Sequence, residues 1–349
     1  MSRKSMAIIS SLLAVSMILS GCGLLGEGSK EIDPPQEEQI VDDASALDEE
    51  SSTTVQGEEV STNTTELYLI DKNGYVVPQS IVLPSSQGVA KQALEHLVEN
   101  GPISNILPNG FRAVLPADTQ VDVDIKDKLA IVDFSPEFAT YKAEDELKIL
   151  QAVTWTLTQF DSVDSVKIQM NGHELNEMPV NKTPISTELT RANGINIDTT
   201  SVKDMTSSKP LTVYYLGGEA DEYYYVPVTK RINSGEDNMV AAVINELVEG
   251  PSLNSELLTE FMPGVALLEE PKVKDGRVSV DFNEMIYSGF EEEVISQRLL
   301  DALVLSLTEQ AGIDSVEVFV NGEASLKLED GKDLSEPVIR PEKVNSSSL

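Results

Sequence analysis

Short stretches in which apolar and polar residues alternate predict β-strands along much of the chain. Successive residues of a strand face opposite sides, so such stretches are typical of strands with one buried face. Asn-Gly pairs, which favour tight hairpin turns, follow some of them. In the first half of the chain the predicted strands are 66–70, 75–83, 121–125, 129–134 and 165–170.

Two further stretches, 88–100 and 144–160, carry apolar residues at helical spacing. Gly101-Pro102 ends the first of them, as expected at the end of a helix. The inward face of the first helix is predicted to hold Ala90, Ala93, Leu94, Leu97 and Val98. That of the second is predicted to hold Leu147, Leu150, Val153 and Leu157.

The whole pattern occurs twice, with a period of about 150 residues. Motifs return in the same order: 97–102 as 247–251, and 132–135 as 280–283. The stretch 163–172, which ends in Asn171-Gly172, returns as 313–322. A shared order over a complete repeat indicates a tandem duplication.

From these elements we predict an α+β fold made of two tandem domains. Each domain would have a leading strand pair, then the order αββαβ, with its two helices packed on a small sheet. The domains are placed at 66–190 and 209–342. The polar stretch 191–208 is expected to be a linker, and 343–349 a disordered tail.

Residues 1–21 have the features of a bacterial export signal. Arg3 and Lys4 precede an apolar run at 7–19, which is shorter than the roughly 20 residues of a spanning helix. Leu19-Ser20-Gly21-Cys22 resembles a lipoprotein lipobox. That resemblance implies cleavage between Gly21 and Cys22 and a diacylglycerol on the Cys22 sulfur. We therefore expect a lipid anchor at Cys22 that holds the chain on the outer face of the cell membrane.

The segment 22–65 is expected to be a disordered acidic tether. Between positions 23 and 65 it has twelve acidic residues and one basic residue, Lys30. It shows no apolar period, so it cannot bury enough surface to offset its ordering entropy.

Composition excludes several classes of function. The chain has 349 residues, with 25 Lys and Arg against 59 Asp and Glu, which gives a net charge of −34. Nucleic-acid binding needs clustered basic residues, so no nucleic-acid partner is expected. The single cysteine excludes an intrachain disulfide and a cysteine-based zinc site. We predict no metal and no cofactor.

The duplicated motifs resemble the GerMN domain, a module of bacterial spore germination and sporulation proteins. In the first copy the resemblance rests on Gly101-Pro102, Pro108, Gly110, Phe138 and the stretches 132–135, 156–158 and 163–172. In the second it rests on Gly250-Pro251, Pro263-Gly264, Leu307-Thr308 and the stretches 280–282 and 313–322. The αββαβ order also resembles the ring-building motifs of secretion-type and sporulation assemblies, an analogy of topology.

This resemblance implies a lipoprotein that acts in endospore formation and germination. It places the chain outside the cytoplasmic membrane, in sporulating cells between the mother-cell and forespore membranes. The partners it implies are the lipid bilayer, through acylated Cys22, and other sporulation envelope proteins. Peptidoglycan is left open as a further partner.

Candidate catalytic residues are few. Asp133 and Asp281 recur at one place in both copies, but a glycan hydrolase needs two facing carboxylates, so a structural role at a turn is favoured. His96 and His173 have no counterparts in the second copy. We predict that the protein is not an enzyme and has no catalytic residue.

Five tyrosines cluster in the leading strand pair of the second copy, and they are predicted as an interaction surface. Tyrosine anchors protein interfaces, although alternate members of the pair could simply pack on the sheet. These residues are Tyr214, Tyr215, Tyr223, Tyr224 and Tyr225.

The function predicted from the sequence is a membrane-anchored, non-enzymatic module for protein interaction and assembly in the spore envelope. Two alternatives stay open. One is an envelope enzyme acting on spore peptidoglycan, which recurrent acids converging in a cleft would favour. The other is a glycan or small-ligand receptor, which an apolar pocket between the domains would favour.

Overall fold

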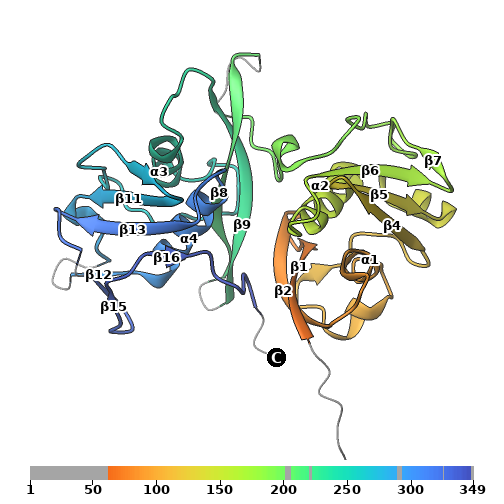
Figure 1. Ribbon diagram of the computed structural model, residues 1–349, viewed down its shortest axis with the longest axis horizontal. Coiled ribbons are helices and arrows are strands. Elements are labelled where there is room, and N and C mark those ends of the chain that lie inside the picture. The colour runs from red at the N-terminus through yellow and green to blue at the C-terminus, as the bar shows by residue number, and fades with distance from the viewer. Residues whose placement is uncertain (1–61, 201–205, 220–221, 289–292, 325, 347–349) are drawn as a thin grey trace, which may run out of the picture. The chain divides into compact units, whose positions relative to one another are not determined.

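The computed structural model describes residues 62–200, 206–219, 222–288, 293–324 and 326–346 (Figure 1). The predicted signal segment, Cys22 and nearly all of the tether therefore lie outside the described residues. Among the residues that are described, no helix is long and apolar enough to cross a membrane. We call 62–200 the first repeat and 206–346 the second repeat.

The first repeat begins with a long antiparallel hairpin and continues with helices and a second sheet. Its strand orders are β2-β1-β3 and β4-β5-β6-β7, with β5 and β6 parallel. Its elements are β1 (Thr62–Asp71), β2 (Val76–Pro84), α1 (Val89–Glu95), β3 (Phe111–Arg112), β4 (Val121–Lys126), β5 (Leu129–Phe134), α2 (Glu146–Leu157), β6 (Ser165–Met170) and β7 (His173–Glu174). The 3-10 turns of this repeat are Pro102–Asn105, Pro136–Thr140, Ala143–Asp145 and Arg191–Asn193.

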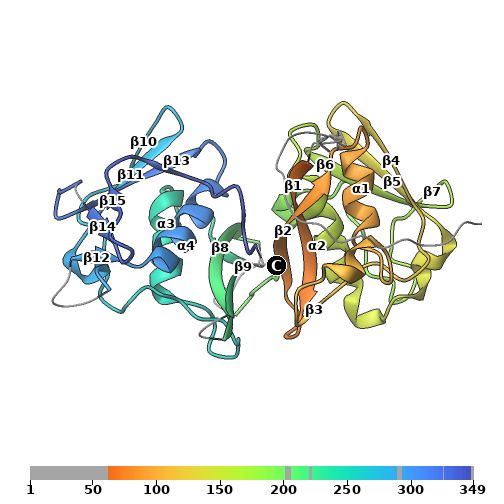
Figure 2. The same cartoon turned by 90° about the horizontal axis from the view of Figure 1, so that it is seen from below.

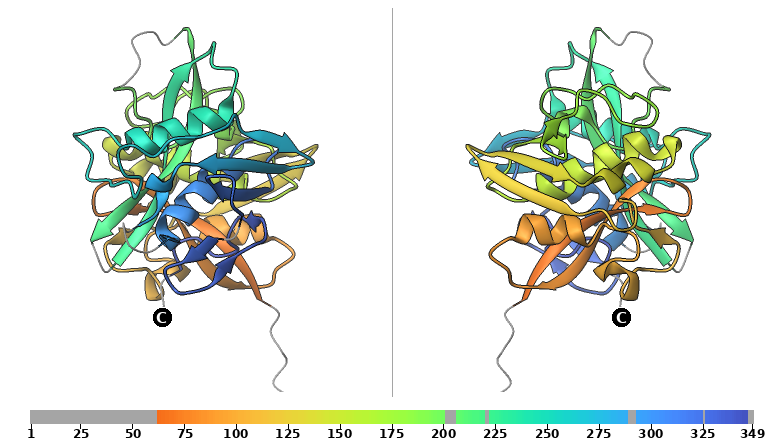
Figure 3. Two further views of the ribbon diagram at one scale, coloured as in Figure 1. Left: turned by 90° about the vertical axis from the view of Figure 1, so that its left-hand side faces the viewer. Right: turned by 90° about the vertical axis from the view of Figure 1, so that its right-hand side faces the viewer.

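The second repeat follows the same plan and adds short strands near its end (Figures 2 and 3). Its sheets are β8-β9, β10-β11-β13-β16 and β12-β14-β15, with β11 and β13 parallel. Its elements are β8 (Ser208–Glu219), β9 (Glu222–Asn233), α3 (Met239–Glu249), β10 (Lys272–Lys274), β11 (Arg277–Phe282), the 3-10 turn Glu284–Ile286, β12 (Val294–Ile295), α4 (Gln297–Thr308), β13 (Ser315–Val320), β14 (Leu326–Leu328), β15 (Asp333–Leu334) and β16 (Val338–Ile339). The predicted α+β class and tandem repeat are confirmed.

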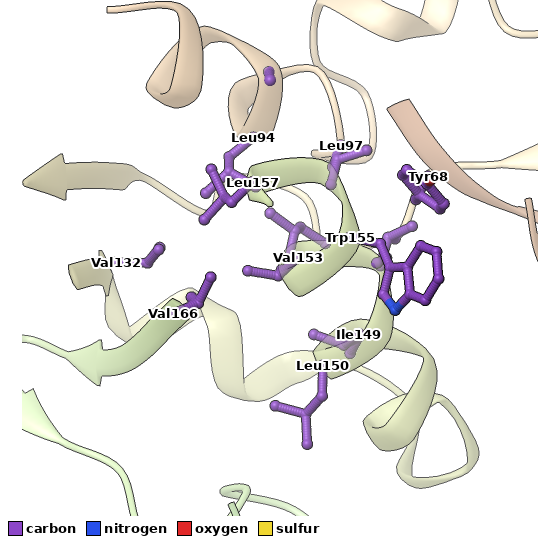
Figure 4. Packing of buried hydrophobic residues seen from close by; sticks show 14 of the residues in the cluster. Tyr68, Leu94, Leu97, Val132, Ile149, Leu150, Val153, Trp155, Leu157 and Val166 are labelled. Atoms are coloured by element: carbon purple, nitrogen blue, oxygen red, sulfur yellow. The ribbon is translucent and has the colours of Figure 1, made fainter. Parts of the chain in front are cut away.

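In each repeat the second helix lies between the leading hairpin and the mixed sheet. The helix α2 contacts β1 on one side and β6 on the other, and α4 contacts β8 and β13. Figure 4 shows Trp155 of α2 beside Tyr68 of β1, with ring centroids 5.7 Å apart. Val153 points instead toward Val132 and Val166 on the sheet side (Figure 4). Residues 152–157 are all buried, because a helix with a layer on each side has almost no solvent face.

One predicted face of α2 needs correction. Leu147, expected to point inward, is 55% exposed, whereas Ile149 is fully buried. The sequence pattern assumed a single apolar stripe, but the hairpin covers a second side of the helix, so the buried positions include Ile149 and Trp155. The first helix is also shorter than the predicted 88–100 and ends at Glu95.

The boundaries of the repeats differ from those expected. Residues 62–65, assigned to the tether, belong to β1 and pair with 81–84. The expected linker is ordered from Arg191 to Asp198, and Ile195 within it is fully buried. The expected disordered tail does not describe Val344, which is 2% exposed, or Asn345, whose side chain bonds to Pro78 and Tyr225. Ile195 and Val344 are single apolar residues within polar segments. They indicated that these segments are ordered, but the polar composition around them favoured a linker and a tail.

We predict that Ile149→Ala lowers the free energy of unfolding by about 2–4 kcal/mol, because it leaves a cavity between the hairpin and the sheet. Leu147→Ala, on the same helix but exposed, should change it by less than about 0.5 kcal/mol. Urea denaturation of the two variants measures both values. Equal losses would show that the buried face of α2 is misassigned.

Candidate functional site

The recurrent aspartates have a structural role in both repeats. Both carboxylate oxygens of Asp133 lie 3.0 Å from the backbone N of Gly172, and Asp281 Oδ1 lies 3.0 Å from that of Gly322. The Asn-Gly turns there have positive φ at both residues, which suits this dipeptide. Each aspartate thus caps the turn that ends the neighbouring parallel strand, a contact across the sheet and not with its own following turn. Neither aspartate is among the residues that line the two clefts described below.

The two histidines lie on different elements of the first repeat, His96 at the end of α1 and His173 on β7. His96 Nδ1 lies 2.8 Å from the carbonyl oxygen of Gln92, one helical turn earlier. His173 is exposed on β7. Within the described parts of the chain, no group of three or more His, Cys, Asp and Glu side chains is placed to hold a metal ion.

The tyrosine cluster is largely buried, so the interaction surface predicted there is wrong for most of its members. Tyr214 is fully buried, Tyr215 is 1% exposed and Tyr225 is 7% exposed. Tyr224 is half-buried, and its hydroxyl donates to Asp71 Oδ2 of the first repeat at 2.7 Å. Tyr223 alone is exposed, at 42%, beneath the guanidinium of Arg298.

Both faces of the β8–β9 hairpin are covered. Alternate side chains along its strands point to opposite faces, and neither face therefore exposes a row of tyrosines. The hydroxyl of Tyr215 donates to the carbonyl oxygen of Glu246 on α3 at 2.8 Å. On the opposite face, Tyr214 belongs to a buried cluster with Ala302 and Leu305 of α4. Burial raises the pKa of both tyrosines well above its ordinary value, so both hydroxyls stay neutral donors.

A charged cleft of about 520 Å³ lies between the two repeats. Arg191 Nη1 lies 2.6 Å from Glu309 Oε1, and Arg340 lies 3.5 Å from Glu309 Oε2 and 3.6 Å from Glu66 Oε1. The guanidinium of Arg191 also stands 4.4 Å from the ring centroid of Trp155. Two arginines thus face two glutamates, and this cleft is a compensated ion-pair network and not an apolar pocket. Sequence reasoning missed Arg191 and Arg340, because both lie outside the repeated motifs. Each follows the last residue of its repeat that pairs with the mixed sheet, Leu189 or Ile339.

A second cleft, of about 700 Å³, belongs to the first repeat alone. Among the residues lining it, Asp145 is 5% exposed at its side chain, and its Oδ1 accepts from Arg112 at 2.7 Å and from Lys148 at 3.0 Å. Burial opposes ionisation of Asp145, but the two cations outweigh it and hold its pKa below the ordinary value. A carboxylate held in this way is a poor proton acceptor at neutral pH.

Next to this cleft, the buried carboxylate of Glu146 organises the loop at 180–183. It accepts from the hydroxyl of Tyr141 at 2.8 Å and from the backbone N–H groups of Val180 and Asn181 at 3.1 and 2.5 Å. Thr183 adds two further donors. Burial raises the pKa of Glu146, but the hydrogen bonds from Thr183, Asn181 and Tyr141 outweigh it, so the pKa lies below its usual value.

The comparisons with known proteins agree with this architecture. A family model described as "Germane: Sporulation and spore germination" matches residues 66–176 and 212–325. The Spore germination protein GerM of Bacillus subtilis (strain 168) is 53% identical over 366 residues, which covers 100% of each chain. The solved tandem GerMN domains of the sporulation protein GerM from Bacillus subtilis are 58% identical, with a TM-score of 0.78 over 82% of this chain and 100% of that one. The solved first GerMN domain of the same protein is 69% identical over 37% of this chain and 97% of that one, with a TM-score of 0.36.

The fold is therefore that of a tandem GerMN protein, with two α+β domains in one chain. The chain belongs to the Germane family and is a GerM-like protein of sporulation and spore germination. The names of the family and of its relative refer to a process and not to a reaction.

Stability of the first repeat should depend on acidic pH through Glu146 and Asp145. Their folded pKa values are depressed, so their contribution is complete above the unfolded values of about 4 and is lost as the pH falls through the folded values. We predict that Glu146→Gln lowers the free energy of unfolding at pH 7 by about 1–3 kcal/mol and flattens its fall between about pH 5 and pH 2.

Denaturant titrations at several pH values would measure this effect. Glu144→Gln, a change at an exposed residue of the preceding turn, is the matched control and should keep the wild-type slope. A Glu146→Gln variant with wild-type stability and slope would contradict the assignment.

Proposed function

We propose that this protein is a lipid-anchored, non-enzymatic interaction module that acts in endospore formation and germination on the outer face of the cell membrane. The anchor is inferred from the lipobox-like Leu19-Ser20-Gly21-Cys22. Two acyl chains on Cys22 would bind stably, since each buried CH₂ contributes about 0.8 kcal/mol. The acidic tether would then carry the two repeats away from the bilayer.

The observation that carries the interaction role is a group of exposed apolar side chains in the second repeat. Between α3 and β10, Leu253 is 103% exposed, Leu258 64%, Met262 48% and Leu268 50%. The segment is fixed, since Leu257, Phe261 and Val265 within it are buried. Exposed apolar side chains concentrated in one fixed segment favour a protein-binding role over an ordinary surface.

This feature distinguishes the two repeats. The corresponding segment of the first repeat, 102–120, is fully described and has no exposed large apolar side chain apart from Pro102. A partner recognised by this segment would therefore bind the second repeat. The excess of acidic residues in the chain favours a partner with a basic or apolar face, such as another sporulation envelope protein.

The open alternatives receive less support from the geometry. The enzyme alternative required recurrent acids facing each other across a cleft, yet Asp133 and Asp281 each bond a glycine N–H at the end of a strand. The receptor alternative required an apolar pocket between the domains, and the cleft found between the repeats is lined by ion pairs.

We expect Cys22→Ala to release the protein from membranes or to leave an uncleaved precursor. Membrane fractionation, immunoblotting and labelling with a radioactive fatty acid would detect this. Processed, membrane-bound protein without acyl label would contradict the proposed anchor.

We expect Leu253→Ser combined with Leu258→Ser to reduce spore formation or germination, because it removes apolar contact area at the proposed partner surface. Leu147→Ser, at a leucine of similar exposure on α2, is the matched control.

Asp133→Asn combined with Asp281→Asn should leave the phenotype nearly intact, since turn caps cost about 0.5–2 kcal/mol whereas a lost general base costs roughly 10²–10⁴-fold in rate.

Phenotype assays with immunoblots of each variant separate these outcomes. Abolished function in the double aspartate variant at wild-type protein level would overturn the non-enzymatic assignment. Wild-type function in the double leucine variant would exclude this segment as the partner surface.

A further inference from the structure

The last segment of each repeat occupies the same place in both. We call 189–198 the internal arm and 338–346 the C-terminal arm. The internal arm begins where Leu189 bridges Val166 of β6, and the C-terminal arm begins where Val338 pairs with Val316 of β13. The strands β2 and β9 are also equivalent, since Pro78 lies opposite Tyr68 in its hairpin as Pro227 lies opposite Tyr214.

Each arm crosses to the second strand of the other repeat's hairpin. Ile195 of the internal arm accepts from the backbone N–H of Thr229 on β9 at 2.8 Å and donates to Thr229 Oγ1 at 2.9 Å. Val344 of the C-terminal arm accepts from the N–H of Ser80 on β2 at 3.0 Å and donates to Ser80 Oγ at 2.7 Å. The two pairs of bonds match atom for atom.

The asparagine that follows each buried arm residue repeats this symmetry. Asn196 Nδ2 donates to the carbonyl oxygens of Val76 and Pro227, and its Oδ1 accepts from the N–H of Val76. Asn345 Nδ2 donates to those of Tyr225 and Pro78, and its Oδ1 accepts from the N–H of Tyr225. Each side-chain amide thus bonds β2 of the first repeat and β9 of the second.

The prolines explain why amides take this position. Pro78 and Pro227 have no N–H. At these positions neither β2 nor β9 can therefore form the complete set of backbone hydrogen bonds with a further strand. A side-chain amide carries one donor group and one acceptor, and it bonds the groups that a neighbouring strand would otherwise bond.

A charged residue of each arm also reaches the other repeat. Arg191 of the internal arm reaches Glu309 of the second repeat at 2.6 Å, and Arg340 of the C-terminal arm reaches Glu66 of the first at 3.6 Å. The backbone bonds and the amides are therefore related by one approximate twofold operation. The ion pairs are not, since Glu309 follows α4 whereas Glu66 lies in β1, opposite Ser80. A surface in which residue i contacts j and j contacts i is that of a homodimer.

We propose that the repeat interface is a dimer interface closed within one chain, and that β2 can accept the C-terminal arm of a second copy. In the intact chain the attached arm competes at a high effective concentration, so the chain closes on itself. Loss of the attached arm, or of its acceptor, would allow exchange between chains.

Two full-chain variants test this proposal. The first lacks residues 341–349 and keeps an open acceptor on β2. The second carries Ser80→Pro, which keeps the arm but removes the N–H that binds it. The Ser80 N–H bonds Val344 and not β1, so the β1–β2 hairpin does not need it. Pro78, two residues earlier, faces the same edge of the strand. Each variant alone should be a monomer, and an equimolar mixture should give a species of two chains by light scattering and native mass spectrometry.

Matched substitutions in the Ser80→Pro chain sharpen the test. Asn345→Ala should weaken the two-chain species by at least about tenfold, because it removes the bonds to Pro78 and Tyr225. Asn196→Ala, in the arm that is not exchanged, should leave the pairing affinity unchanged. A mixture that stays monomeric while both variants are folded would overturn the proposal. An arm-deleted chain that fails to fold would also overturn it, because the arm would then belong to the fold and could not be exchanged.

Discussion

The structure depends on satisfying the outer edges of its two leading hairpins. The strands β2 and β9 each have an edge that their hairpin partner cannot pair, and each carries a proline, Pro78 or Pro227, on that edge. Buried backbone groups without partners are costly, so these edges need an external set of donors and acceptors. Asn196 and Asn345 provide it, and in doing so they join the two repeats.

This joining explains why the hairpins are buried on both faces. The hairpins pack on α2 and α4, and the hydroxyls of Tyr214 and Tyr224 bond acidic side chains near the contact between the repeats. Tyr214 illustrates the result: its backbone bonds Ser306, its hydroxyl bonds Glu309, and Arg340 lies over its ring. Aromatic residues that suggested a binding surface are used to hold the chain together.

The polar residues at equivalent positions of the two repeats also have structural roles. Asp133 and Asp281 fix turns, and Arg191 and Arg340 neutralise Glu309 and Glu66. One difference between the repeats is the segment after the first helix, which exposes leucines only in the second. The positions that build the fold are shared by the two repeats, whereas the exposed side chains of this segment differ between them.

The sequence by itself determined the main helices and longer strands, their order and the duplication, because these follow from local periodicity and from turn residues such as Asn171-Gly172. It also favoured a structural over a catalytic role for Asp133, although the turn that Asp133 caps follows the neighbouring strand β6 and not its own strand. The burial of the tyrosines, the exposure of Leu147 and the ordering of Ile195 and Val344 were decided by the tertiary structure. Each depends on a second layer or on the other repeat, and contacts between residues far apart in the chain leave no local pattern to read.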